Sequence, residues 1–184
     1  MMIGFVKPAL VVIAALNFFA SATAAPTPEP ELEPIDYVGL IETAPGLPTP
    51  KELGLTNADL TKPAPELGEL MARDILNKRA QCATSTKPNC GYFEALACYN
   101  YLNSLTGTRC VVNSAPALTR FCYSGSCAWY GQSGIWGQPA SSPCVNVAAG
   151  GAWVLNSCYV NGRVAGDSTA TGNGNVIIYI ERLK

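Results

Sequence analysis

"FCYSGSCAWYGQ", residues 121–132, carries the clearest fold signal in the sequence. Residues typical of β-strands stand on both sides of a Ser-Gly pair at 124–125, and this pattern predicts a β-hairpin. The hairpin carries two cysteines, Cys122 and Cys127, on either side of a four-residue turn. They can bridge each other across the turn, or each can pair with a cysteine of a distant element, and both possibilities stay open from the sequence.

Two predicted helices flank this hairpin along the chain. In 91–107 the apolar residues recur every three to four positions and a glycine follows the last turn, which predicts a helix with one buried face. The same spacing in 144–158 predicts a second helix, although Gly150 and Gly151 each cost a helix interior about 1 kcal/mol. These small residues predict that the second helix packs closely against its neighbours.

Further strands complete the predicted fold. "RCVVN" at 109–113 is a short strand candidate, an Asn-Gly turn stands at 161–162, and "VIIYI" at 176–180 alternates between two faces. The order of these elements is helix, strands, helix, strand. It predicts an α+β fold: a small disulfide-rich sandwich with two helices packed on one face of an antiparallel sheet.

The cysteine pattern indicates an oxidising compartment. The chain has eight cysteines: Cys82, Cys90, Cys98, Cys110, Cys122, Cys127, Cys144 and Cys158. The even number predicts four disulfides. Zinc binding is the alternative, but the sequence has no CxxC pair and no histidine, so we expect no metal and no cofactor.

The N-terminus has the pattern of a secretory signal peptide over residues 1–24. Lys7 supplies a positive charge, an apolar run follows, and small residues ending at Ala24 form a cleavage site. A membrane anchor is the alternative, but a run of about a dozen apolar residues is short for a bilayer. We therefore expect a secreted, extracellular protein without stable membrane insertion once the signal is removed.

Residues 25–79 form an acidic, proline-rich zone without cysteines. They hold nine of the fourteen prolines, and ten acidic residues against five basic ones give a net charge of −5. The zone ends in Lys78 and Arg79, a site for a kexin-type processing protease. Alternatively, the pair complements the dipole of a helix expected at 65–79. We interpret 25–79 as a pro-segment and 80–184 as the disulfide-rich mature domain.

The residue inventory argues against catalysis. Without histidine, Ser-His, Cys-His and His-metal chemistry are excluded, and bridged cysteines offer no thiolate. The carboxylates beyond residue 80 are Glu94, Asp167 and Glu181, which we interpret as surface charges. A net charge of +3 without a basic cluster gives no support for nucleic-acid binding. We expect that the protein is not an enzyme.

The best candidate for binding is the segment around 130–138. Trp136 and Tyr130 are interleaved with Gln132 and Gln138, and aromatic faces beside amides suit either a sugar ring or a protein hot spot. The alternative places Trp129 in the core and Trp136 packed over a loop. Three glycines near Trp136 favour an exposed loop, so we predict Trp136 on the surface and Trp129 in the core.

The order of motifs resembles a known family. A cysteine-bearing helix precedes "GSCAWYG", "VLNSC", "NGRVAG" and "GNGNVIIYI", and "LMARD" at 70–74 precedes the basic pair. From Cys90 to Leu183 this is similar to small secreted fungal effectors of the necrosis-inducing type, whose compact α/β fold resembles a viral killer toxin of smut fungi. The resemblance implies an effector or toxin-like protein involved in virulence. It assigns no functional residue.

Three functional hypotheses follow. The first is a secreted effector or toxin-like protein that binds a host or competitor component. The second is a glycan-binding, lectin-like module of the cell wall, and the third, with weaker support, is a carboxylate-dependent hydrolase. The expected partners are a host or competitor protein or a cell-surface glycan, together with the kexin-type protease.

Overall fold

The computed structural model describes residues 34–66, 80–83, 90–172 and 174–182. From Ile35 onward they belong to one compact unit. The predicted signal peptide and the Lys78–Arg79 pair lie outside the described residues, as does most of the helix expected at 65–79. In the described part of the chain, no helix combines the length and the apolar character needed to cross a bilayer.

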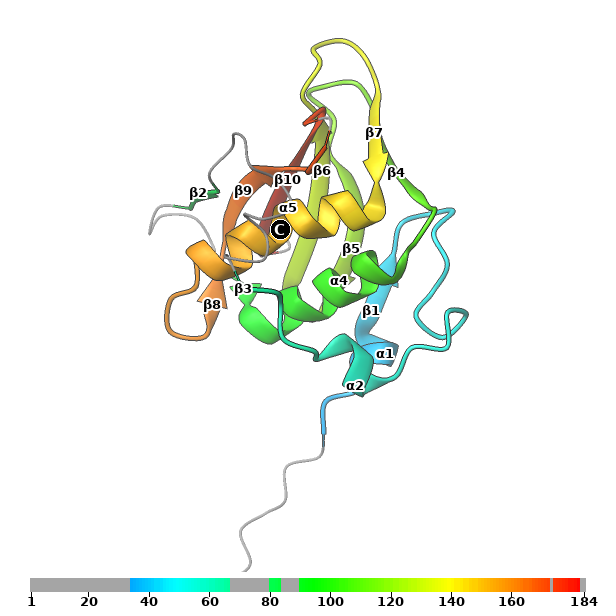
Figure 1. Cartoon of the computed structure of the whole chain (residues 1–184), viewed down its shortest axis with the longest axis vertical. Coiled ribbons are helices and arrows are strands. Elements are labelled where there is room, and N and C mark those ends of the chain that lie inside the picture. Colours follow the sequence, from blue (N-terminus) through cyan, green and yellow to red (C-terminus); the bar gives the residue numbers. More distant parts are fainter. Residues whose placement is uncertain (1–33, 67–79, 84–89, 173, 183–184) are drawn as a thin grey trace, which may run out of the picture. The chain divides into compact units, whose positions relative to one another are not determined.

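A six-stranded antiparallel sheet forms the centre of this unit, with the order β1-β5-β6-β10-β9-β2 (Figure 1). Its strands are β1 (Ile41–Thr43), β5 (Thr119–Ser124), β6 (Cys127–Ser133), β10 (Val176–Arg182), β9 (Gly166–Thr169) and β2 (Gln81–Cys82). Two further antiparallel pairs are β3 (Cys90–Gly91) with β8 (Arg163–Val164), and β4 (Arg109–Val112) with β7 (Ala140–Pro143). The predicted hairpin is thus confirmed as β5–β6, at the middle of the sheet.

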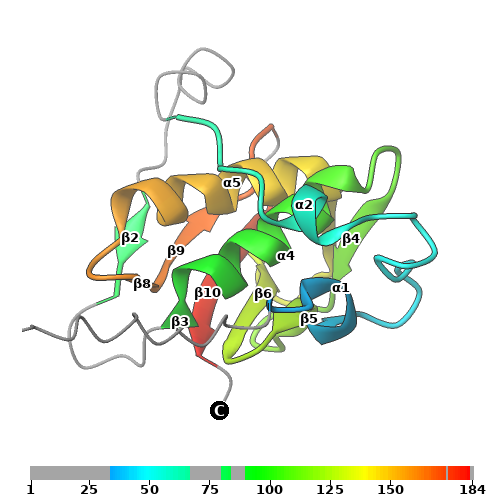
Figure 2. The ribbon, with the colours of Figure 1, turned by 90° about the horizontal axis from the view of Figure 1, so that it is seen from below.

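The two long helices, α4 (Tyr92–Ser104) and α5 (Cys144–Ser157), pack on one face of the sheet (Figure 2). This confirms the predicted α+β architecture. The two glycines in α5 explain how close the helix lies: a Cβ on Gly151 would overlap the Trp129 ring, and one on Gly150 would overlap the Thr169 carbonyl. Their helix-propensity cost is therefore offset by packing against the sheet.

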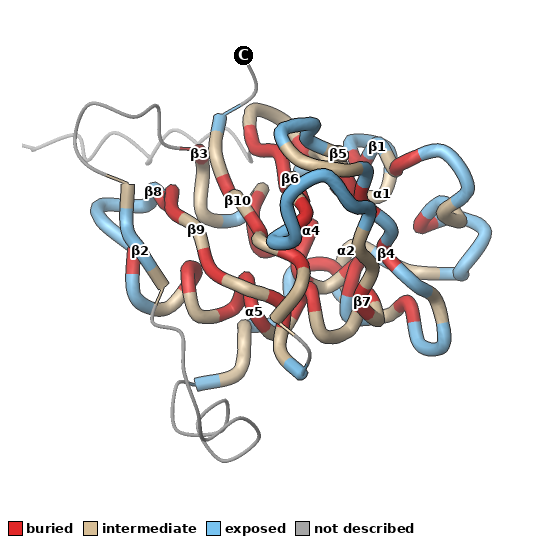
Figure 3. Tube along the Cα trace, turned by 90° about the horizontal axis from the view of Figure 1, so that it is seen from above, coloured by how far each residue is buried: buried red, intermediate tan, exposed pale blue. Residues whose placement is uncertain are grey.

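Alternation along the strands fills the space between sheet and helices (Figure 3). Ile178, Ile180 and Trp129 are fully buried there, whereas the neighbouring Ile177 and Tyr179 are partly exposed on the other face. The predicted Asn-Gly turn also forms, with positive φ at both Asn161 (49°) and Gly162 (77°). A period of two thus separates a helix-covered face from an outer face of the sheet.

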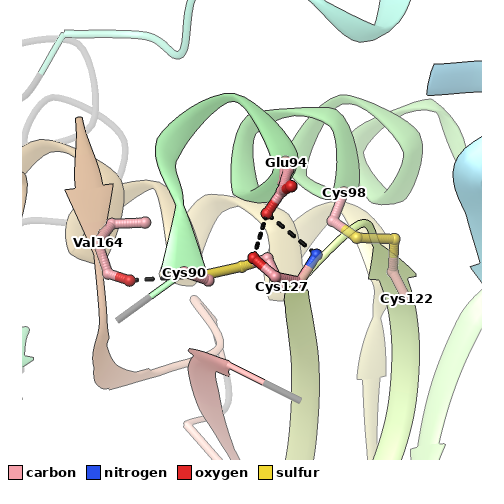
Figure 4. Close-up of a disulfide and its surroundings, with 7 residues drawn as sticks. Cys90, Glu94, Cys98, Cys122, Cys127 and Val164 are labelled. Atoms are coloured by element: carbon pink, nitrogen blue, oxygen red, sulfur yellow. Dashed lines mark hydrogen bonds between the residues drawn. A yellow bond between two sulfur atoms is a disulfide. The ribbon is translucent and has the colours of Figure 1, made fainter. Parts of the chain in front are cut away.

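The turn of the β5–β6 hairpin is fixed to α4 by a carboxylate. Glu94 accepts hydrogen bonds from the Ser126 backbone N–H (3.1 Å) and from its hydroxyl (2.6 Å). Gly125, in the turn, has a φ of 57°, a conformation that favours glycine. Figure 4 shows Glu94 reaching from the helix toward the turn beside Cys127.

Four disulfides hold the strands and the two long helices together, and every cysteine is bridged. Cys98–Cys122 fastens α4 to the hairpin, and Cys90–Cys127 fastens β3, which leads into α4, to the same hairpin (Figure 4). Cys110–Cys144 and Cys82–Cys158 hold the start of α5 and the residue that follows its end. The predicted number of bridges is confirmed. A local Cys122–Cys127 bridge does not form. Cys122 lies opposite Trp129 in the hairpin register and pairs with Cys98 of α4, whereas Cys127 pairs with Cys90 of β3.

Part of the acidic zone packs against the cysteine-rich domain. Residues 35–66 contain α1 (Tyr37–Leu40), β1 and α2 (Asn57–Leu60) and belong to the same compact unit as the domain. Several apolar side chains of this segment, including Tyr37, Ile41 and Leu60, are buried in the compact unit. The segment therefore has order because it folds on a partner surface that the same chain provides.

Candidate functional site

The outer face of the sheet is the first part of the candidate site. Trp129 contacts α5, so the next residue of β6, Tyr130, points to the opposite face. Tyr130 stands directly across from Tyr179 of β10 and across from Arg120 of β5. The same alternation and pairing place Tyr123, Gln132, Asp167, Ile177 and Glu181 on this face. The face therefore combines phenol rings with amide and charged groups.

Hydrogen bonds fix the side chains of this face near the C-terminal end of β6. The Tyr179 hydroxyl donates to Oε1 of Gln132 at 3.1 Å, and Nε2 of Gln132 donates to the carbonyl of Pro116 at 3.0 Å. The carbonyl only accepts, so it determines which end of the Gln132 amide faces Pro116. Gln132 thus joins the tyrosine pair to the loop 113–118.

Burial is the main cause that raises the pKa of two phenols on the outer face, Tyr130 and Tyr179. Burial raises the pKa of Tyr130, and Glu181 and Tyr123 raise it further while the Arg120 guanidinium opposes them. Burial also raises the pKa of Tyr179, as do the nearby carboxylates Asp167 and Glu181. Both rings are neutral phenols at neutral pH. The Tyr179 hydroxyl donates its proton to Gln132, so the Tyr130 hydroxyl is the donor that suits a partner with oxygen acceptors.

Arg120 links the outer face to the edge of the sheet. Its guanidinium lies 5.6 Å from the ring centroid of Tyr123, and it forms an ion pair with Glu42 of β1 at 3.3 Å. Both partners of this ion pair are considerably exposed, so it contributes little to stability. Its consequence is to hold the guanidinium beside the tyrosine rings.

An exposed tryptophan stands next to this face. The loop 134–139 follows β6 and presents Trp136, whose side chain is 80 % exposed. The loop is held by a bridge between Trp136 and Ala115 and by a hydrogen bond from the Gly134 N–H to the Asn175 carbonyl at 2.8 Å. Ile135 and Leu118 are also exposed. The loop therefore exposes apolar side chains and is linked to Ala115 and Asn175 of two neighbouring loops.

The structure brings the predicted binding residues into one region. Tyr130 and Gln132 lie on the outer face, and Trp136 and Gln138 lie in the adjoining loop, where both are exposed. The predictions that Trp136 lies on the surface and Trp129 in the core are confirmed by their exposures of 80 % and 0 %. Sequence reasoning missed Tyr179, because its pairing with Tyr130 joins two segments almost fifty residues apart.

Glu94 lies apart from the other two carboxylates beyond residue 80. The interpretation of Glu94 as a free surface charge is wrong, because its carboxylate binds the hairpin turn on the helix side of the sheet. Asp167 and Glu181 lie on the outer face, near Tyr179. Glu94 and Asp167 therefore do not form the facing pair that glycoside hydrolysis requires.

A second group of exposed rings lies where α4 begins. Tyr92 makes edge contacts with Phe93 and Tyr159, at centroid distances of 5.7 and 5.1 Å. Phe93 and Tyr159 are exposed, and Tyr92 is partly exposed. The other two tyrosines of this helix, Tyr99 and Tyr101, are buried. This group lacks the anchored amide that accompanies the rings of the outer face.

The comparisons with known proteins identify the domain and give it no activity. A family model described as "Domain of unknown function (DUF8794)" matches residues 77–182, more than half of the chain. No curated protein matches the chain, and no solved structure matches it. The matched region starts three residues before Ala80, close to the boundary between the acidic zone and the cysteine-rich domain. The chain belongs to the DUF8794 family, a domain of unknown function.

Proposed function

We propose that this protein is a secreted effector or toxin-like protein that acts by binding a component of a host or competitor. The observation that carries the proposal is Trp136, which is 80 % exposed in the loop after β6. This loop bridges Ala115, next to the Pro116 carbonyl that binds Gln132, and Gln132 in turn binds Tyr179. Tryptophan and tyrosine dominate binding hot spots, and a large ring left in solvent gains free energy when a partner covers it.

The disulfides support the extracellular part of the proposal. Four bridges in a domain of about one hundred residues are typical of extracellular proteins. They also hold the sheet rigid, which lowers the entropy cost of binding through a preformed surface. The resemblance to fungal necrosis-inducing effectors favours virulence as the biological setting, with kexin-type processing after Arg79 as the step that completes the protein.

Glycan binding is the second candidate. The Tyr130 and Tyr179 rings stand side by side with the Gln132 amide held between Tyr179 and Pro116. Rings provide stacking surfaces for sugars, and an oriented amide with phenol hydroxyls provides hydrogen bonds to sugar hydroxyls. This arrangement fits a cell-surface glycan as well as a protein loop.

The proposal is tested with fluorescently labelled secreted protein and intact plant, insect, fungal and bacterial cells. We expect saturable binding to at least one cell type, competed by unlabelled protein. Pretreatment of those cells with protease removes binding if the partner is a protein, and pretreatment with glycosidases removes it if the partner is a glycan. Absence of saturable binding to every cell type, or turnover of polysaccharides by the protein, would contradict a binding function.

A further inference from the structure

Most side-chain hydrogen bonds from the cysteine-rich domain to residues 35–66 share one feature. Arg120 pairs with the Glu42 carboxylate, but three other side chains of the domain donate to main-chain carbonyls. Asn100 of α4 binds the carbonyls of Leu60 (2.9 Å) and Lys62 (2.8 Å), and Asn156 of α5 binds that of Pro65 (2.9 Å). The Tyr101 hydroxyl binds the carbonyl of Pro48 (2.7 Å). The domain thus recognises backbone, which any extended polypeptide offers.

The segment bound across the helices is pre-shaped for this recognition. Residues 62–66 read "KPAPE" and cross from α4 to α5 (Figure 2). Lys62 and Ala64 each precede a proline, which pushes both into extended conformations. Pro63 and Pro65 have no backbone N–H, so at these two residues only the carbonyl needs a hydrogen-bond partner. The two asparagines supply donors for this purpose.

An apolar anchor precedes the extended part. Leu60 ends α2 and is fully buried. A capping box between Thr56 and Asp59 fixes the start of α2, and it presents Leu60 toward α4. At the sheet, β1 adds a strand to the edge of β5, with Ile41 opposite Ser124. The segment therefore combines strand addition, one buried leucine and a main-chain-bound proline strand.

No disulfide joins residues 35–66 to the cysteine-rich domain, so the main chain is their covalent link. All four disulfides link cysteines between 82 and 158, and residues 25–79 contain none. The family match also begins after the segment, at residue 77. A cut after Arg79 would leave 35–66 bound by reversible contacts to a domain whose bridges are unaffected.

We propose that the outer surfaces of α4 and α5 form a binding site for an extended, proline-containing polypeptide, which residues 60–65 occupy in the uncut chain and which processing opens to a partner. The inference rests on the proposed function, since it supplies a second surface and a partner chemistry for a protein that acts by binding. The site reads main-chain carbonyls through Asn100 and Asn156 and takes one apolar side chain where Leu60 lies.

The test uses the folded full chain before and after cleavage at Arg79 with a kexin-type protease. A fluorescent synthetic peptide, residues 57–66, is titrated while its anisotropy is followed. We expect saturable binding to the cut protein and about 100-fold weaker binding to the uncut one, because a tethered occupant competes at millimolar effective concentration. A peptide carrying Leu60→Ala should bind the cut protein at least about tenfold more weakly.

Variants of the domain separate this site from others. Asn100→Ala removes two hydrogen bonds and should weaken the peptide about tenfold, whereas Asn103→Ala, exposed on the same helix, should leave affinity unchanged. Asn156→Ala provides a second variant at the other end of the strand. Equal binding to cut and uncut protein would place the peptide elsewhere and overturn the inference.

A further result would also overturn it. If the cut segment does not exchange with the labelled peptide overnight, 35–66 is a permanent subunit and no site is opened. Binding of the cut protein to cells is measured in parallel. Saturable cell binding without peptide binding rejects this inference and leaves the proposed function standing, whereas peptide binding without cell binding rejects the proposed function.

Discussion

Replacement of Leu60 by Ala tests how firmly the acidic segment is attached to the domain. Leu60 is 0 % exposed and lies where α2 packs on α4, so the change removes buried surface and leaves a cavity. Leu→Ala changes at such sites cost about 2–5 kcal/mol. The segment has no disulfide to the domain, so we expect this free energy to be lost from the attachment of the segment rather than from the domain.

Hydrogen exchange of the full chain measures that loss. The variant carries Lys78→Ala and Arg79→Ala so that it stays uncut. Exchange of amides in 41–44, which pair with β5, reports the opening of the segment. A cost of about 2 kcal/mol or more corresponds to at least roughly 30-fold faster exchange there. Amides of β6 and β10 should be unaffected, because the domain keeps its bridges.

Leu53→Ala is the matched control. Leu53 belongs to the same segment but is 36 % exposed, so its removal should change opening by about 0.5 kcal/mol or less. If Leu60→Ala and Leu53→Ala accelerate exchange equally, Leu60 is not an anchor. The account of the segment as an ordered occupant of the domain surface would then be wrong.

Other predictions address the core, the termini and alkaline pH. Trp129→Ala should destabilise the protein by about 3–5 kcal/mol in a denaturant titration, because its fully buried ring packs on α5. The intact mass of secreted protein should correspond to a chain that begins at Ala80 with four bridges, and an N-terminus at Ala25 would contradict processing. Burial raises the pKa of Tyr101 to about 12 in the uncut chain, so the folded state binds its proton more tightly than the unfolded state. The stability that the protonated Tyr101 phenol contributes should be complete below about pH 10 and lost as pH rises toward 12. Tyr101→Phe should reduce this alkaline loss of stability. An unchanged dependence of the free energy of unfolding on alkaline pH in that variant would refute the assignment.

Local pattern predicted much of the fold. The spacing of apolar residues located both long helices, and alternation around Gly125 located the hairpin, because these signals depend on neighbours within one turn or one strand. Cysteine pairing was not predictable. Cys98 and Cys122 meet because α4 lies across the hairpin, and that contact depends on tertiary packing rather than on sequence spacing.

The sequence predicted those residues of the candidate site that lie close together along the chain. Tyr130, Gln132 and Trp136 lie close together in sequence, and the glycines around Trp136 indicated an exposed loop. Tyr179 joins them only through the β6–β10 register, which a single sequence does not reveal. The packing of residues 35–66 on the domain was missed, because the composition of a segment carries no information about a surface elsewhere on the chain.

The central claim is that the protein acts by binding through the outer face and the Trp136 loop. The most direct measurement is the affinity of Trp136→Ala for the cell type that binds the wild-type protein, determined by competition with labelled protein. Val111→Ala is the control, an exposed apolar residue on β4. The free energy of unfolding of both variants should lie within about 0.5 kcal/mol of the wild-type value.

We expect Trp136→Ala to lose about 30-fold or more in affinity, as truncation of a hot-spot ring costs about 2 kcal/mol or more, and Val111→Ala to bind normally. A folded Trp136→Ala protein with unchanged affinity would contradict the claim.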